Sequence, residues 1–412
     1  MPLQGQRQVY IPGLLYFVDF FVSLLNINQT TMWHNILKCL IPALLLTGLL
    51  FSCEQTEKKK KSGKTLPVPE YTIGVNLPLT GNGSYFAEEV KKGLDLSFGF
   101  VNDSSRRMSI KVLYEDNMMN PRDAVGITKK FLEIEKVDLL IMGYTPLIQA
   151  TIGLVNDHRV PALVTLSSVE DIAAPYEWVF RDFEMESRMM PMMAEYAFDE
   201  LGLRSGSWLV VNDDMGRDVV RYFSESFEAL GGNMMEGEVF EPTETGLRNK
   251  VSKVLARDPG FVIVIGRGSA LINACRQIRE RMPELPLFSN NTVDNDDVWQ
   301  ALGPAGNNIW FPRPFTDRSG KRYNRINEQF VARYGHEMNW LNVYGISIAN
   351  YLVRGLQASG GEPEKMKEYL RTLRVESIRG LLVMGENSDV LIPHEVYRRK
   401  NGESIPAKAD EQ

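Results

Sequence analysis

The sequence has few of the residues that build metal sites and disulfides, with three cysteines and four histidines among 412 residues. Cys39 and Cys53 lie in a hydrophobic N-terminal region, so the remaining chain holds only Cys275 and cannot close an internal disulfide. We expect Cys275 to be a small buried residue on a helix. The histidines that follow the N-terminal region have neither metal-site nor catalytic-triad spacing, and we expect them in loops or on the surface: His158, His336 and His394.

The sequence also lacks the short motifs of phosphate loops, dinucleotide sites and common hydrolases. It contains no G-x-x-x-x-G-K-[ST], G-x-S-x-G or H-E-x-x-H. The segment GNGSYF begins as G-x-G but has Phe86 where a dinucleotide fingerprint has its third glycine. The acidic run 294–297 lacks the glycine and distal glutamate of a calcium loop, so we expect a helix cap there. We therefore predict no cofactor, no metal and no enzymatic activity.

An excess of positive charge is missing as well. The chain has 46 basic and 52 acidic side chains, and its net charge of -6 gives no basic field for nucleic acid. Its composition, 44% hydrophobic and 24% charged, is ordinary for a globular protein. A chain of this length has room for two domains, each with its own core.

The N-terminus has the pattern of a targeting segment. The apolar run CLIPALLLTGLLF (39–51) is too short for a comfortable membrane span but has the length of a signal-peptide core. It ends in LFSC, which resembles a lipobox, with a bulkier Phe51 than that motif usually has. We predict a signal region at 1–52, a lipidated Cys53, and a polar linker at 53–69. A plain signal peptide or a membrane anchor is the alternative.

Met32 stands where a signal of this kind would normally begin. Residues 1–31 are then surplus and indicate a misplaced start, with an extra anchor as the alternative. In either case we expect an exported protein, anchored by lipid to the membrane and facing the periplasm or the cell exterior.

From Tyr71 onward, short β-rich runs alternate with helical patterns, which is typical of parallel sheets covered by helices. The first set of strands is YTIGVNLP, MSIKVLYED, DLLIMG, PALVTL and WVFRD, and the second is GSWLVVND, NMMEGEVFE, FVIVIG and LPLFS. Helices are expected at 84–102, 187–201, 321–334, 341–358 and 363–373, with two or three β segments at the end. The fold class is therefore α/β, with two Rossmann-like sheets.

Several segments in order resemble one family. IGVNLPLTGNGSYFAEEVKKGLDLSFGFVN, YEDNMMNPRDAV, IMGYTPLIQATIGLVNDHRVPALVTLSS and VVNDDMGRDV are similar to segments of the branched-chain amino-acid (Leu/Ile/Val)-binding proteins, the type I periplasmic binding proteins of ABC transporters. FVIVIGRGSALINACRQIRE and the ending SDVLIPHEVYRRKNG fall where that family has them. Met215 replaces a tyrosine that is common in the fourth segment. The resemblance covers roughly residues 70–404.

This resemblance implies two lobes joined by three crossovers, a Venus flytrap that closes on a ligand. Lobe 1 would comprise 70–186 and about 313–383, lobe 2 would comprise 187–312 and about 384–404, and 405–412 would be a tail. Strand C-termini and helix N-termini would then face the cleft, where free backbone N–H groups can bind an anion.

The resemblance also indicates which residues line the cleft. Thr145, Ser167 and Ser168 would hold a ligand carboxylate, with a helix cap as the alternative role for Thr145 and a turn as the alternative for the serines. Tyr144 would stack on the ligand. Phe86 would form an aromatic wall, unless it is a core residue.

Three further positions bear on the ligand's charge. Glu186 aligns with an acid that the family places near the ligand ammonium, and a surface glutamate is the alternative. Asn291 stands where the family often has an acid, and Arg267 where an aromatic is common, unless Arg267 is simply on the surface. These departures favour an amino acid with a polar or acidic side chain, or another small carboxylate.

We therefore predict the solute-binding lipoprotein of an ABC importer, with a small-molecule ligand, an ABC permease complex and the membrane as partners. The alternative is a ligand-sensing or regulatory lipoprotein of the same fold, for example one acting on cell-wall synthesis.

Overall fold

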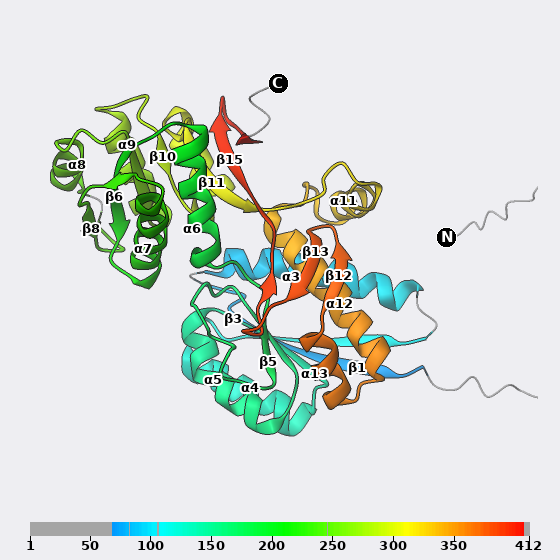
Figure 1. Ribbon diagram of the computed structural model, residues 1–412. Coiled ribbons are helices and arrows are strands. Elements are labelled where there is room, and N and C mark those ends of the chain that lie inside the picture. The colour runs from blue at the N-terminus through cyan, green and yellow to red at the C-terminus, as the bar shows by residue number, and fades with distance from the viewer. Residues whose placement is uncertain (1–67, 82, 105–106, 245, 408–412) are drawn as a thin grey trace, which may run out of the picture. The chain divides into compact units, whose positions relative to one another are not determined.

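The computed structural model describes residues 68–81, 83–104, 107–244 and 246–407 (Figure 1). They all belong to one compact unit, residues 67–412. The predicted signal region and the lipidated Cys53 lie outside the described residues, as does most of the linker.

The first sheet has five parallel strands in the order β2-β1-β3-β4-β5. Alternate residues of its strands face opposite cores. Leu139 and Ile141 pack with helix α3, whereas Leu140 and Met142 pack with α5. The strands are β1 (Glu70–Leu77), β2 (Ser109–Asp116), β3 (Leu139–Gly143), β4 (Ala162–Thr165) and β5 (Val179–Arg181). The helices between them are α3 (Ser84–Ser104), α4 (Pro121–Lys129) with its π-helical continuation Lys130–Glu135, and α5 (Thr145–His158).

The second sheet has eight strands in the order β16-β15-β11-β10-β9-β6-β7, with β8 beside β6. Four phenylalanines with ring centroids 5.1–5.8 Å apart fill its core: Phe223, Phe227, Phe261 and Phe288. Its strands are β6 (Ser205–Val211), β7 (Asn233–Met234), β8 (Glu238–Phe240), β9 (Phe261–Ile265), β10 (Leu287–Phe288), β11 (Ile309–Pro314), β15 (His394–Lys400) and β16 (Glu403–Pro406). Its helices are α6 (Glu186–Glu195) with π-helical Tyr196–Glu200, α7 (Asp214–Ala229), α8 (Arg248–Leu255), α9 (Gly268–Arg279) and α10 (Asp296–Leu302), with 3-10 turns at Asn291–Val293 and Gly303–Gly306.

Three later helices belong to the first lobe: α12 (Trp340–Ser359) and α13 (Pro363–Arg371) share the core of the first sheet, and α11 (Lys321–Tyr334) packs against α3 and α12. Helices α12 and α3 cross so closely that a Cβ atom on Gly93 would lie 2.2 Å from the carbonyl oxygen of Asn342, and one on Gly345 would lie 2.1 Å from that of Val90. Only glycine allows backbones to approach in this way. The helices predicted at 321–334, 341–358 and 363–373 are confirmed.

The chain passes between the two sheets three times: after β5, after β11 and after β14. A small third sheet, β12 (Arg374–Ser377), β13 (Gly380–Met384) and β14 (Val390–Leu391), precedes the last passage, and Val390 packs in the core shared by α3 and α12. The predicted lobe limit near 384 falls inside this sheet, and the lobe limits stay predictions. The predicted α/β fold with two lobes and three crossovers is confirmed.

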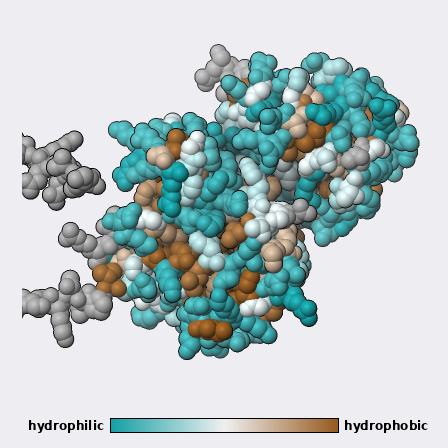
Figure 2. Space-filling model, turned by 180° about the vertical axis from the view of Figure 1, so that it is seen from behind, coloured by the Kyte–Doolittle hydropathy of each residue, from teal (hydrophilic) through white to brown (hydrophobic). Residues whose placement is uncertain are grey.

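Most side chains on the face shown in Figure 2 are hydrophilic, and hydrophobic ones gather in small patches. Among the described residues, no helix is both long and apolar enough to cross a membrane.

Candidate functional site

A cleft of about 640 Å³ is lined by residues from both lobes. It lies at the carboxyl ends of strands, where parallel sheets commonly bind ligands. Thr145 follows β3, Ser167 follows β4, and Arg267 follows β9. The structure brings all eight predicted side chains to this cleft: Phe86, Tyr144, Thr145, Ser167, Ser168, Glu186, Arg267 and Asn291. Their contact with a ligand remains a prediction.

Two hydroxyl groups face each other at the N-terminus of α5. Thr145 is the first residue of this helix, and its Oγ1 lies 2.8 Å from Oγ of the buried Ser167. Tyr144 occupies the cap position, and no side chain caps the helix. Thr145 therefore does not act as the helix cap that was its alternative role. An uncapped helix N-terminus beside two hydroxyls is well suited to bind an anion.

Tyr144 has an unusual backbone conformation, with φ 67° and ψ 127°. A positive φ is costly for a residue with a Cβ atom, and strained conformations of this kind cluster at functional sites. The phenol donates a hydrogen bond to the Gly83 carbonyl, and burial raises the pKa of Tyr144 well above its ordinary value. The ring is thus held against the loop that follows β1, at the edge of the cleft.

An aromatic wall forms one side of the cleft. Phe86 and Phe183 each place a ring centroid 6.3 Å from that of Trp340, and Phe183 lies 5.7 Å from Tyr344. Phe86 thus packs against the core of the first lobe and also lines the cleft. The two positions considered for it, in the cleft wall and in the core, therefore both describe where it lies. Trp340 is a cleft residue that the sequence did not reveal.

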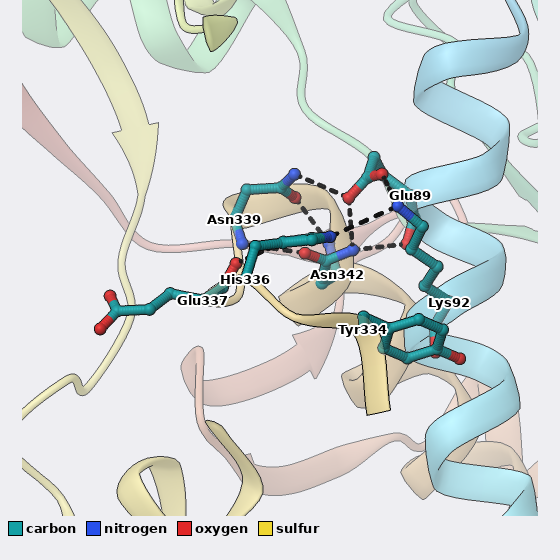
Figure 3. Close-up of polar contacts among 7 residues, drawn as sticks. All are labelled: Glu89, Lys92, Tyr334, His336, Glu337, Asn339 and Asn342. Atoms are coloured by element: carbon teal, nitrogen blue, oxygen red, sulfur yellow. Dashed lines mark hydrogen bonds and ion pairs between the residues drawn. The ribbon is translucent and has the colours of Figure 1, made fainter. Parts of the chain in front are cut away.

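A polar network fixes the start of α12 (Figure 3), and Trp340 is the first residue of this helix. Asn339 caps the helix in a reciprocal pair with Asn342. The amide groups of both asparagines donate to Oε2 of the buried Glu89 at 2.9 Å, and Lys92 is ion-paired to the same carboxylate. Because α3 carries Glu89 and α12 carries both asparagines, the network ties the two helices together beside the cleft.

Two buried carboxyl groups line the cleft. Glu186, 2% exposed, accepts a hydrogen bond from Asn290 at 2.9 Å, while its other oxygen, Oε2, has no partner among the described residues. Burial raises the pKa of Glu186 to about 7, against the opposing effect of the Asn290 bond. The alternative of a surface glutamate is wrong, because α6 begins at Glu186 on the cleft side.

Glu184 is the second of these groups and was not predicted. It is 1% exposed, accepts a 3.3 Å hydrogen bond from the Tyr344 hydroxyl, and leaves Oε2 without a partner in the described part of the chain. Burial and then the charge of Glu186 raise its pKa well above the ordinary value. The signal in the sequence is an acid between two apolar residues, Phe183 and Met185, directly after a buried strand.

The remaining predicted residues belong to lobe 2. Arg267 is exposed and forms a 2.6 Å ion pair with Asp213, which caps α7. Asn291 is 8% exposed and starts a 3-10 turn that Asn290 caps. The resembling family often has an acid after LPLFS, where this chain has the amides Asn290 and Asn291. Carboxyl groups reach the cleft instead from Glu184 and Glu186, which follow β5.

Other sequence expectations have clear outcomes. Asn295 caps α10, which confirms a capping role for the acidic run, and Cys275 is buried on α9. His394 does not lie on a surface loop, since it starts β15 and buries an Nε2 atom that has no partner among the described residues. Within those residues, no three potential ligands cluster as a metal site.

Comparisons with known proteins agree with this fold. A family model described as "Periplasmic binding protein" matches residues 70–397. Among curated proteins, none matches the sequence significantly.

Several solved structures are similar to this fold. A leucine-binding protein from Thermotoga maritima is 19% identical with a TM-score of 0.73, over 82% of this chain and 97% of that one. A branched-chain amino-acid transporter substrate-binding protein from Streptococcus pneumoniae, in complex with isoleucine, is 16% identical with a TM-score of 0.73, over 81% and 97%. An ABC-transporter solute-binding protein from Rhodopseudomonas palustris, in complex with 3,4-dihydroxybenzoic acid, is 17% identical with a TM-score of 0.72, over 82% and 95%.

The family match spans most of the chain, and the two-lobed architecture with its cleft is the one that such proteins share. This family consists of extracytoplasmic proteins that bind small molecules and carry out no catalysis. The chain belongs to the periplasmic binding protein family and is a solute-binding protein, not an enzyme.

Proposed function

We propose that the cleft captures an amino acid by its two charged main-chain groups. The carboxylate lies against the hydroxyls of Thr145, Ser167 and Ser168 at the N-terminus of α5. The ammonium group takes the free Oε2 of Glu186. One observation carries the proposal: an uncapped helix N-terminus with paired hydroxyls and a buried, half-satisfied carboxyl group line the same cleft.

The ligands named for the similar structures support the carboxylate half of this proposal. Leucine, isoleucine and 3,4-dihydroxybenzoic acid differ in size and polarity, yet each carries a carboxylate. Glu186 favours amino acids over aromatic carboxylates that have no ammonium group. A buried carboxyl oxygen without a hydrogen-bond donor favours a ligand that supplies such a donor.

We further propose that the protein is the exported, Cys53-anchored receptor of an ABC importer and passes its ligand to the permease complex. The LFSC motif after a short apolar run supports the anchor. Membership of the periplasmic binding protein family supports the transport role, since the similar structures include transporter components.

A thermal-shift screen tests the capture proposal, because a ligand that binds only the folded state raises the melting temperature. The screen contains the amino acids and benzoate-type carboxylates, and calorimetric titration then measures affinity for each hit. The methyl ester of a hit removes the carboxylate charge, and its deamino analogue removes the ammonium group. We expect both analogues to bind at least tenfold more weakly. Equal binding of either analogue would refute the corresponding contact.

A further inference from the structure

Glu184 has no role in the capture of an α-carboxylate and an α-ammonium group, although it lines the same cleft as Glu186. The two acids lie two residues apart on the segment that leaves the first sheet after β5. Oε1 of Glu184 accepts the Tyr344 hydroxyl, whereas Oε2 is buried with no partner among the described residues. A buried carboxyl oxygen without a donor is costly, and such a group often marks the place of a ligand.

Among the described residues, Arg379 is a cation that acts on Glu184, but it is ion-paired to another carboxylate. Arg379 stacks over the Tyr344 ring, with its guanidinium carbon 4.1 Å from the ring centre. Its Nη1 atom, however, donates to Asp182 at 2.8 Å in a buried ion pair. The two Nη atoms of this arginine thus bind Asp182, its Nε has no partner in the described part of the chain, and no ion pair of Glu184 is formed there.

The cleft as a whole is rich in carboxyl groups. Five acidic side chains line it: Glu184, Glu186, Asp213, Asp214 and Asp218. Arg267 is the basic side chain of this lining, and its charge is offset by the 2.6 Å ion pair with Asp213. Arg267 is therefore not a free counter-charge for an acidic ligand, whereas Glu184 and Glu186 each present a buried carboxyl oxygen without a partner among the described residues.

The aromatic wall of the cleft also favours a ligand with a positively charged group. Phe183 precedes Glu184 in the chain and packs against Trp340, and both line the cleft. Aromatic faces attract ammonium and guanidinium groups, more strongly when water is excluded. A neutral hydroxyl could satisfy the carboxyl oxygen but would gain nothing from the rings.

We propose that the cleft selects an amino acid with a second cationic group, and that Glu184 holds this group beside the rings of Phe183 and Trp340. The proposal rests on the function proposed above, since Glu186 and the hydroxyl cluster (Thr145, Ser167 and Ser168) still bind the main-chain groups.

The ionisation of Glu184 is consistent with this role. Burial, Glu186 and Asp294 raise its pKa, while the Tyr344 bond and Arg379 lower it with a smaller effect. In the empty cleft the carboxyl group is therefore held towards its neutral form. A bound cation would stabilise the carboxylate, and the displaced proton would pass to the solvent.

Calorimetric titration with two matched pairs tests the proposal. Lysine is compared with norleucine, which lacks the ammonium group, and arginine with its uncharged isostere citrulline. A charge-assisted hydrogen bond corresponds to a preference of roughly 10- to 150-fold for the cationic member of at least one pair. In Glu184→Gln this preference should disappear, while the affinity for the neutral member stays within about threefold.

Asp214→Asn is the matched control, because Asp214 lines the same cleft but is exposed and ion-paired to Arg217. It should keep the preference, which separates a direct contact from the general field of the cleft. Melting temperatures of both variants verify folding, and the preference of the unmodified protein decides the question even if Glu184→Gln does not fold.

Two results would overturn the inference. The first result is that norleucine or leucine binds the unmodified protein as tightly as lysine and arginine do. This result would refute the role of Glu184 and leave the capture proposal intact. An unchanged preference in folded Glu184→Gln would do so as well. Failure of every amino acid to bind would instead refute the capture proposal itself.

Discussion

The hydroxyl of Thr145 lies 2.8 Å from the hydroxyl of Ser167, at the edge of the sheet where β3 and β4 end side by side. Each group satisfies the other when the cleft is empty, and each keeps bonding capacity for a ligand. Since no side chain caps α5, the pair stands directly at the positive end of the helix. This arrangement supports the proposal that two residues 22 positions apart form one anion site.

Thr145→Val should weaken ligand binding by roughly 10- to 150-fold, since a hydrogen bond to a charged group contributes about 1.5–3 kcal/mol. The change is nearly isosteric and removes one hydrogen bond within the protein. Calorimetric titration with the hit from the amino-acid screen measures the loss. Ser167→Ala and Ser168→Ala are measured beside it.

Thr151→Val provides the control on the same helix. Its hydroxyl is buried, donates to the Leu147 carbonyl at 2.7 Å, and does not line the cleft. This variant should change stability without changing affinity. Parental binding in all three variants of the hydroxyl cluster would show that the carboxylate is bound elsewhere.

Arg379→Met should lower the free energy of unfolding by about 3–5 kcal/mol, because it leaves the fully buried Asp182 without its partner. The double variant Asp182→Asn, Arg379→Met should lose less, since no uncompensated charge remains and Tyr351 can still donate to position 182. Urea denaturation measures both. The exposed pair Lys365–Glu362 is the comparison, and Lys365→Met should cost less than about 1 kcal/mol. Equal losses in the single and double variants would contradict this account.

Local patterns carried most of the fold prediction. Alternating apolar runs marked the parallel strands, and three- to four-residue spacing marked helices such as α3 and α12, because burial on one or two faces dictates those periods. The family resemblance selected Thr145, Ser167 and Arg267, and these residues line one cleft because parallel strands present their carboxyl ends to the same edge of a sheet.

Long-range contacts could not be predicted in this way. Trp340 reaches the cleft because α12 crosses α3 at a pair of glycines, and no local pattern specifies that crossing. The burial of Glu184 and Glu186 depends on Tyr344 and Asn290, which lie more than 100 residues away. Charge and exposure in the cleft therefore required the structure, and the predicted preference for polar or acidic ligands was drawn without them.

Ligand binding should reduce the radius of gyration in small-angle scattering. A ligand that contacts Thr145 in one lobe and Asn291 in the other binds a closed form better than an open form. Thr145→Val at the same ligand concentration should show a smaller change, because fewer molecules are occupied. An unchanged radius at saturating ligand would count against closure by lobe rotation.

Mass spectrometry of membrane-extracted protein should find Cys53 as the N-terminal residue, carrying two or three acyl chains. Residues 1–52, including the apolar run 39–51, would then be absent from the mature protein. Cys53→Ser should remove the acyl chains and release the protein from the membrane fraction. An intact N-terminus at Met1 or Met32 would contradict the lipoprotein assignment.

The contribution of Glu186 to the free energy of unfolding should fall as the pH rises from 4.5 to 7, while the lowered pKa of the buried His394, about 4, acts in the opposite direction. Burial raises the pKa of Glu186 from its ordinary value of 4.5 to about 7, so the folded state binds more protons than the unfolded state in this interval. Below it both states are protonated, and above it both are ionised, so the loss is complete at pH 8. Each pKa unit corresponds to about 1.4 kcal/mol, which gives a loss of about 2–3 kcal/mol between pH 5 and pH 8.

Glu186→Gln should abolish this part of the pH dependence, since glutamine keeps the shape of the side chain and does not titrate. Glu184, whose pKa burial raises well above its ordinary value, leaves a slope of the same sign in the variant. Urea denaturation at pH 5 and pH 8 measures the difference, with the exposed Asp214→Asn as a control that should retain the full parental slope. Parallel pH profiles for Glu186→Gln and the parent would show that the Glu186 carboxyl is ionised at both pH values, and would remove the physical basis for its role as a buried, half-satisfied acceptor.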